Sequence, residues 1–464
     1  MRTEKDSLGE KRVPKEAYYG IQALRGSENF KISGIREPEV FIRAYVSIKK
    51  AAAQVNFELG ALDKKIAHAI IHAADDVLGG KFLDQFIIDV FQAGAGTSFN
   101  MNTNEVLANR ALETMGYHKG EYAHAHPNDH VNMAQSTNDT FPTAMRISAL
   151  WEYDLLKQAL LGLIKALKEK AKAFDHIPKA ARTHLQDAVP IRLGQEFEAF
   201  AMTLEKARHH IESAKEGLCH LNIGGTAAGT GINSHPQYAS KMVDALSHMT
   251  KLPLKQPLSY VEIAQSTADF VTYSSALKNL ALDIIKIAND LRLLSSGPTV
   301  GFGEIQLPAV QPGSSIMPGK VNPVIAECAN MVCYQVIGND VTVSMASQAS
   351  QLQLNVMMPV IVFNLLLSSK ILTNAMMMLR EKCIEGILAN EKQCRANFEK
   401  TLGLATALNP IIGYEKAAEV VKEAVRSDTS ILQVIEKKGI LSKKEIQKLF
   451  SADRLTAPGI LKRD

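Results

Sequence analysis

The chain has 464 residues, of which 46% are hydrophobic and 22% are charged, a balance that is normal for a globular protein with its own core. The formal net charge of +4 is small for this length, and no basic run is interleaved with aromatic residues, so nucleic acid is not expected as a partner. Length alone predicts about two to four domains.

The five cysteines are scattered and include no CxxC pair. This pattern argues against a disulfide framework or a zinc site and is typical of a reducing cytoplasm. The N-terminal segment, residues 1–15, is charged and lacks an apolar core, so no signal peptide is expected.

Residues 341–369 carry no charged side chain, which raises the alternative of a membrane span. They contain three glutamines and two asparagines, however, and a helix that faces lipid disfavours so many amides. We therefore expect a helix buried among other helices, and no membrane as partner.

The first part of the chain, to about residue 136, mixes short elements. Apolar periodicity predicts helices at residues 44–59, 63–78 and 105–115. A glycine-rich turn is expected at 94–98, and a polar loop at 124–138 precedes a helix that starts near Pro142.

From there the pattern predicts long helices. Leu156, Leu160, Leu163 and Leu167 are spaced by three and four residues, which defines one stripe of a helix that ends before Pro178. A second polar loop is expected at 182–190. Further helices are predicted at residues 195–218, 264–296, 323–343 and 359–387.

Several long helices in near succession predict a bundle. Beyond about residue 390 the expected helices become short again. We therefore predict a mainly α protein with an N-terminal mixed helical domain (1–136), a central long-helix bundle (137–390) and a small C-terminal helical domain (391–464).

Residues 313–323 read Gly-Ser-Ser-Ile-Met-Pro-Gly-Lys-Val-Asn-Pro, and this density of glycine and proline predicts a loop. It is not a phosphate loop, because five residues separate Gly313 from Gly319 and Val321 follows the lysine. Neither serine fits a nucleophile elbow. A plain connection between helices is one alternative. Two hydroxyls, an amine and an amide in so short a stretch favour an anion-binding loop that moves a proton.

Three further polar loops, at residues 94–104, 135–139 and 183–187, are rich in Ser, Thr, Asn and His. Such side chains donate the hydrogen bonds that a dicarboxylate requires. Each loop also has a simpler explanation. Ser136 and its neighbours are typical of a helix cap, Thr97 follows glycines that favour a turn, and His184 is one of 13 histidines.

The stretch 313–323 closely resembles the signature G-S-S-x-M-P-x-K-x-N-P of the aspartase/fumarase superfamily, and the other loops resemble that family's remaining signature regions in the same order. The resemblance covers nearly the whole chain. It implies a three-domain, mainly α fold whose central bundle is shared across a homotetramer, with each site built from three subunits. It also implies an elimination that releases fumarate from a small dicarboxylate, without a cofactor or a metal.

The resemblance implies a role for each polar residue. Ser314 would be the catalytic base. The β-carboxylate would be held by Thr97, Ser136, Thr137 and Ser315. The α-carboxylate would be held by Thr183, Lys320 and Asn322. The leaving group would contact Asn138 and His184, and Glu327 would pair with this histidine.

Several stretches resemble the aspartase branch of the superfamily more than its fumarase branch. Residues 17–20, Ala-Tyr-Tyr-Gly, stand where fumarases usually have a Trp-Gly pair, and Thr137 stands where they tend to have a second serine. Residues 291–298 and 351–357 are also similar to aspartases. This branch implies ammonia as the leaving group.

Three alternatives stay open at this point: a class II fumarase, a lyase of a nucleotide substrate, and a structural protein that reuses the fold. Intact Ser314, Lys320, Asn322 and His184 argue against the last. Two residues depart from the family pattern, Thr299 in place of an arginine and Met358 in place of a glutamate that aspartases often have. Neither belongs to the expected substrate set.

Overall fold

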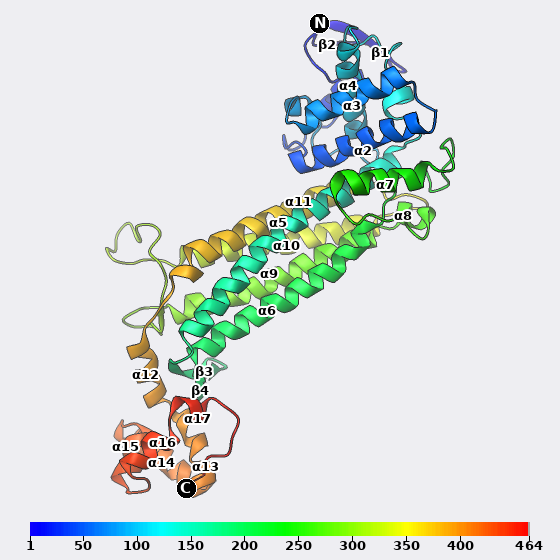
Figure 1. Cartoon of the computed structure of the whole chain (residues 1–464). Coiled ribbons are helices and arrows are strands. Elements are labelled where there is room, and N and C mark those ends of the chain that lie inside the picture. The colour runs from blue at the N-terminus through cyan, green and yellow to red at the C-terminus, as the bar shows by residue number, and fades with distance from the viewer. Residues whose placement is uncertain (463–464) are drawn as a thin grey trace. The chain divides into compact units, whose positions relative to one another are not determined.

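The computed structural model describes residues 1–462 and is mainly helical, as predicted, with three two-stranded sheets in that range (Figure 1). The chain divides into two compact units. Unit 1 comprises Met1–Lys157, His209–Ala281 and Tyr334–Leu372, and unit 2 comprises Gln158–Arg208, Leu282–Cys333 and Thr373–Asp464. The division into domains 1–136, 137–390 and 391–464 stays a prediction.

Five long helices contribute residues to both units, and they account for the predicted bundle. They are α5 (Thr137–Ala173), α6 (Leu193–Ala214), α9 (Ala268–Leu294), α10 (Val324–Gln348) and α11 (Met358–Lys382). Within unit 1 their segments pack side by side (Figure 1): Lys278 of α9 lies 2.7 Å from Asp340 of α10, whose neighbour Asn339 donates to Ser368 of α11 over 2.9 Å. Within unit 2, Asn330 of α10 donates to Asn289 of α9 over 2.7 Å.

The remaining elements of unit 1 are shorter. They are β1 (Arg2–Asp6), β2 (Gly9–Val13), α1 (Ile21–Asn29), α2 (Glu39–Glu58), α3 (Lys64–Leu78), η1 (Leu83–Gln85), α4 (Thr97–Thr114), η2 (Pro127–Val131), η3 (Lys215–Cys219), α7 (Tyr238–Thr250) and α8 (Tyr260–Gln265). Strands β1 and β2 form an antiparallel hairpin. Helix α3 begins where Asp63 accepts hydrogen bonds from the amides of Lys65 and Ile66, because the first amides of a helix have no partner within it.

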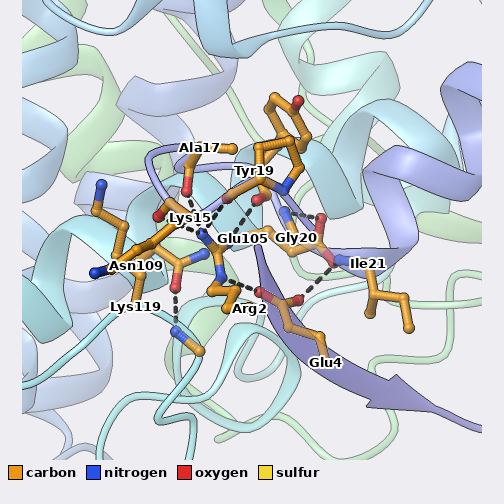
Figure 2. A network of polar contacts seen from close by, with 12 residues as sticks. Arg2, Glu4, Lys15, Ala17, Tyr19, Gly20, Ile21, Glu105, Asn109 and Lys119 are labelled. Carbon is orange, nitrogen blue, oxygen red and sulfur yellow. Dashed lines mark hydrogen bonds and ion pairs between the residues drawn. The ribbon is translucent and has the colours of Figure 1, made fainter. Parts of the chain in front are cut away.

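A polar network ties the N-terminus of α1 to α4 (Figure 2). The buried carboxylate of Glu105 accepts hydrogen bonds of 2.8–3.0 Å from the amides of Gly20, Gln22 and Ala23, and Glu4 accepts one from Ile21. These are the amides that a helix start leaves unpaired. A Cβ at position 20 would lie 2.7 Å from both carboxylates, so glycine there leaves room for them.

Unit 2 also contains two antiparallel strand pairs and the C-terminal helices. Its shorter elements are β3 (Pro178–Thr183), β4 (Gln186–Arg192), β5 (Ile305–Gln306), η4 (Ile384–Gly386), β6 (Leu388–Ala389), α12 (Glu391–Lys400), η5 (Leu402–Ala407), α13 (Asn409–Ile412), α14 (Tyr414–Ser427), α15 (Ile431–Lys437), α16 (Lys443–Leu449) and α17 (Ala452–Leu455). The C-terminal helices share an apolar core that includes Leu404, Val420 and Ile435. This cluster agrees with the short helices expected beyond residue 390.

The predicted polar loop at 182–190 is wrong, because these residues lie in the β3–β4 hairpin. Its turn consists of His184 and Leu185, with φ of 55° and 59°. Two left-handed residues form the turn that matches the twist of a hairpin. The usual Asn-Gly signal of such a turn is absent here, so the hairpin has no visible mark in the sequence.

Several helix boundaries also differ from the prediction. Helix α4 begins at Thr97 and α5 at Thr137, both earlier than expected. Polar residues in their first turns bond to other segments: Asn100 of α4 accepts from Lys49, and Asp139 of α5 accepts from Gly224 and Thr226. The run 264–296 is interrupted between α8 and α9, and η3 rather than α6 covers residues 215–219.

Residues 341–369 are not one helix. Helix α10 ends at Gln348 and α11 starts at Met358, since Asn355 between them donates to the carbonyls of Ala346 and Ser347. In the part of the chain that the structure describes, one helix, Met358–Gly386, is long and apolar enough to cross a membrane, but 61% of its apolar window is buried inside the protein. That burial is typical of a core helix.

Arg146 on α5 is fully buried and gives a test of unit 1. Its guanidinium donates to Asn222, to the carbonyl of Gly217 and to Asp269, over 3.1, 2.7 and 2.9 Å. We expect Arg146→Met to destabilise the protein by about 2–3 kcal/mol, because it leaves these acceptors without a donor. Thermal unfolding would show a midpoint several degrees lower.

The matched control is Lys165→Met on the same helix. Lys165 is exposed and lies 3.9 Å from Glu169, so its loss should cost less than about 0.5 kcal/mol. Equal midpoints for the two variants would contradict the role given to Arg146.

Candidate active site

The signature stretch lies in an irregular segment, residues 307–323, between β5 and α10, as predicted. The segment folds back on itself. The amide of Ser314 donates to the carbonyl of Lys320 over 3.0 Å, and the amide of Lys320 donates to the carbonyl of Met317 over 3.2 Å. A Cβ on Gly313 would lie 1.5 Å from the Lys320 carbonyl oxygen. Glycine at this position therefore allows the loop to close.

The closed loop surrounds the Ser314 hydroxyl with hydrogen-bond donors. Its Oγ accepts from the amides of Ile316 and Met317, over 3.2 and 3.1 Å. Backbone donors aimed at an oxygen stabilise its ionised form. The arrangement can therefore stabilise an alkoxide, which is what a serine needs in order to accept a proton.

The other polar groups of the loop are free to meet a ligand. Within residues 1–462 the Lys320 ammonium and the Asn322 amide make no hydrogen bond or ion pair, and Lys320 and Ser315 are exposed. Ile316 is also 82% exposed. This loop thus presents donors and apolar side chains together.

The hairpin turn of unit 2 carries the predicted Thr183 and His184, both exposed. Across residues 1–462, His184 has no ion-pair partner, and Glu327, in the first turn of α10, lies 4.0 Å from Arg292. The predicted pairing of Glu327 with His184 stays a prediction.

In unit 1 the predicted residues lie at two helix starts. Thr97 is the first residue of α4, and its hydroxyl donates to the carbonyl of Gly94 over 2.5 Å. Ser136 precedes α5, accepts from the amide of Asn138 and donates its own amide to Asp139. The cap interpretation of Ser136 is therefore correct, and it is compatible with ligand binding because the helix start still presents amides.

These two helix starts are adjacent. Gly96, the residue before α4, has φ of 92°, and a Cβ on it would lie 2.1 Å from the ring of Phe141, the fifth residue of α5. Two neighbouring helix N-termini combine partial positive charge with unpaired N–H groups, which favours an anion. A carboxylate near Thr97 and Thr137 fits this environment.

Buried polar residues that the sequence analysis missed support these helix starts. Lys49 on α2 is fully buried and donates to Asn100, Asn132 and Gln135 over 2.7–2.9 Å, and burial lowers its pKa to about 7. Its position on the apolar face of the predicted helix 44–59 was the available signal. A lysine with three amide acceptors holds the loop that precedes α5.

Asp139 joins α5 to the glycine-rich loop at 224–231. One carboxylate oxygen accepts from Ser136, and the other accepts from Gly224 and Thr226, over 2.9–3.1 Å. Burial raises the pKa of Asp139 to about 7. The neighbouring Asn138, a predicted ligand of the leaving group, donates to the carbonyl of Ala227.

The chain is similar to known lyases over most of its length. The sequence model described as "Lyase" matches residues 9–338, and that described as "Fumarase C C-terminus" matches residues 404–457. Among relatives, an aspartate ammonia-lyase of Bacillus subtilis (strain 168) is 49% identical over 99% of this chain and 97% of its own length.

Solved structures give the same result. A fumarate lyase:delta crystallin from Brucella melitensis bound to cobalt superposes with a TM-score of 0.96, at 49% identity over 98% of this chain and all of that chain. A class II fumarase from Schistosoma mansoni gives 0.93 at 36% identity, over 97% and 98% of the two chains. The fold and the loops define a mainly helical lyase. The chain belongs to the aspartase/fumarase superfamily.

Gly313 provides a test of the loop geometry. We expect Gly313→Ala to lower lyase activity by at least about tenfold, because the new methyl group would force the Lys320 carbonyl away and displace Ser314. Thermal stability should change little, since the loop is exposed. Steady-state kinetics and a melting curve would check both expectations.

Gly319→Asn is the matched control. Gly319 has φ of 83° with open space around its Cα, and asparagine tolerates this left-handed conformation. A loss of activity as large as that of Gly313→Ala would show that loop closure at Gly313 is not the cause.

Proposed function

We propose that the protein is an ammonia-lyase that converts L-aspartate reversibly to fumarate and ammonia by anti elimination. The observation that carries the proposal is the Ser314 hydroxyl, which accepts two backbone hydrogen bonds inside a loop of the family's signature sequence. The choice of aspartate is supported by the name of the Bacillus subtilis relative and by its 49% identity, against 36% for the fumarase.

The difficult step is removal of a proton from Cβ, which is a very weak acid even beside a carboxylate. In the proposal, the Ser314 alkoxide takes this proton and the electron pair moves into the β-carboxylate, which becomes an enediolate. Preorganised donors stabilise such a developing charge. This is the role we assign to Thr97, Ser136, Thr137 and Ser315, the first three of which lie at or beside helix starts.

The enediolate then collapses to the double bond of fumarate. The C–N bond breaks with its electron pair going to nitrogen, so the ammonium group leaves as ammonia. Asn138 and His184 are assigned to this group, and Glu327 to the histidine. Thr183, Lys320 and Asn322 are assigned to the α-carboxylate, which stays charged throughout and so orients the substrate.

We also propose a homotetramer in which each site takes polar loops from three subunits. Support comes from α10, where Tyr334, Val341 and Met345 fall on one face and are 57%, 57% and 59% exposed in the single chain. An uncharged exposed face of this kind favours burial by another copy. The unpaired His184, with Glu327 beside Arg292 instead, favours a partner from another subunit.

A cytoplasmic location is part of the proposal. It is supported by the five cysteines, all of them free. The proposed chemistry requires no cofactor, because hydroxyls, amides and one lysine supply the donors.

Incubation with L-aspartate should release fumarate and ammonia without added nucleotide or flavin, and malate should be a poor substrate. Absorbance of fumarate measures both reactions. A malate rate above the aspartate rate would identify a fumarase, and turnover of adenylosuccinate alone would identify the nucleotide-substrate alternative. No turnover of any of the three would favour a structural protein.

Shared sites predict complementation between inactive variants. Ser314→Ala should lower kcat by about 10²–10⁴, the range for loss of a general base, and His184→Ala should also be impaired. When the two are denatured and refolded together, some mixed sites carry neither lesion, so activity should partly return. Light scattering checks the tetramer. Mixed tetramers without recovered activity would contradict the shared sites.

A further inference from the structure

We propose that Glu304 is a positioning residue. Its buried carboxylate holds the His184 turn and the stem of the 307–323 loop, by which we mean residues 304–306, so that the two polar segments move together. Glu304 lies immediately before β5, the short strand from which this loop leaves. Its side chain is 0% exposed. The consequence for catalysis rests on the proposed function, but the mechanical link does not.

The carboxylate of Glu304 has four donors. Arg182 binds it through both terminal nitrogens, over 2.8 and 3.1 Å, and Lys179 lies 2.9 Å from it. Asn397 of α12 donates over 2.9 Å. Burial alone would raise the pKa of Glu304, but the hydrogen bond from Arg182 and the charge of Lys179 lower it, so the group stays ionised.

The cationic partners belong to the hairpin. Lys179 and Arg182 are both in β3, and Arg182 directly precedes Thr183 and the His184 turn. The Arg182 guanidinium also lies over the ring of Phe302, 4.2 Å from its centre. The arginine therefore contacts the chain on the N-terminal side of Glu304 as well as Glu304 itself. A bidentate, stacked arginine has little freedom to move.

The backbone around Glu304 is equally well anchored. Its amide donates to the carbonyl of Leu294 at the end of α9, and its carbonyl accepts from the amide of Asn390, both over 2.9 Å. Strand β5 then pairs with β6. The stem of the loop thus has one fixed position within unit 2, and Arg182 transfers that position to the hairpin turn.

Stability alone does not account for this cluster. Lys179 is 1% exposed and also contacts Glu196, so two cations and two carboxylates balance. Replacing a buried ion pair by apolar residues of similar volume is often neutral or stabilising. A bidentate guanidinium–carboxylate contact between two segments defines their relative position more sharply than apolar packing does. In the proposed tetramer the two segments enter different sites, so Glu304 would couple two sites through one chain.

Arg182→Lys tests the link, because lysine keeps the charge but cannot make the bidentate contact. Hydrogen exchange of the intact enzyme should lose protection at the turn and also in residues 307–323, where no atom was changed. With aspartate, kcat/KM should fall by about tenfold to a hundredfold, as expected for misplaced binding groups, with part of the change in KM because Thr183 is assigned to the α-carboxylate.

Two further variants keep the test decisive. Asn397→Ala removes one donor from a half-buried side chain and should give a smaller loss of protection in both segments, even if Arg182→Lys does not fold. Arg192→Lys changes the same hairpin at β4, where Arg192 contacts Asp175 and Thr456, and should leave residues 307–323 and the kinetic constants unchanged.

Unchanged exchange in residues 307–323 for both Arg182→Lys and Asn397→Ala would overturn the proposal. So would an equal effect of Arg192→Lys. If the wild-type enzyme releases no fumarate from aspartate, the proposed function fails, while the exchange experiment still decides whether Glu304 links the two segments.

Discussion

The hydrogen bond from the Ser314 amide to the Lys320 carbonyl is the constraint on which the proposed chemistry depends. It closes a loop whose sequence cannot form regular structure, and it brings two amides onto the serine hydroxyl. A serine has no catalytic basicity of its own at neutral pH, so its oxygen must be stabilised as an anion before it accepts a proton. Strand β5 and helix α10, which flank the loop, provide fixed ends for it.

The two units supply different kinds of electrostatic support. Unit 1 offers two adjacent helix starts, backed by a buried lysine and a buried aspartate, and the charged groups lie behind the backbone rather than at the surface. Unit 2 offers exposed side chains on a loop and on a hairpin turn, backed by the Glu304 cluster. In each unit the groups that we assign to the substrate are polar, and buried titratable side chains hold the segments that carry them.

The sequence predicted the helical class, the long helices and the irregular signature loop, because periodicity and glycine–proline density are local signals. It did not predict the β3–β4 hairpin, whose turn contains neither glycine nor asparagine. It predicted separate helices at 323–343 and 359–387, but its expectation of one buried helix over 341–369 is wrong. The side-chain amide of Asn355 in the connection between α10 and α11 bonds to carbonyls eight and nine residues away. The sequence did not predict the roles of Lys49, Asp139 and Glu304, because each role depends on hydrogen-bond partners far away in the chain.

The His184 turn has a consequence for how such an enzyme tolerates change. Both turn residues carry side chains in a left-handed conformation that costs of order 1–3 kcal/mol each when it is not occupied by glycine. Asn-Gly would form this turn with less strain. Selection for heat resistance alone would therefore favour replacement of His184. Retention of the histidine would indicate that the sequence is under selection for activity.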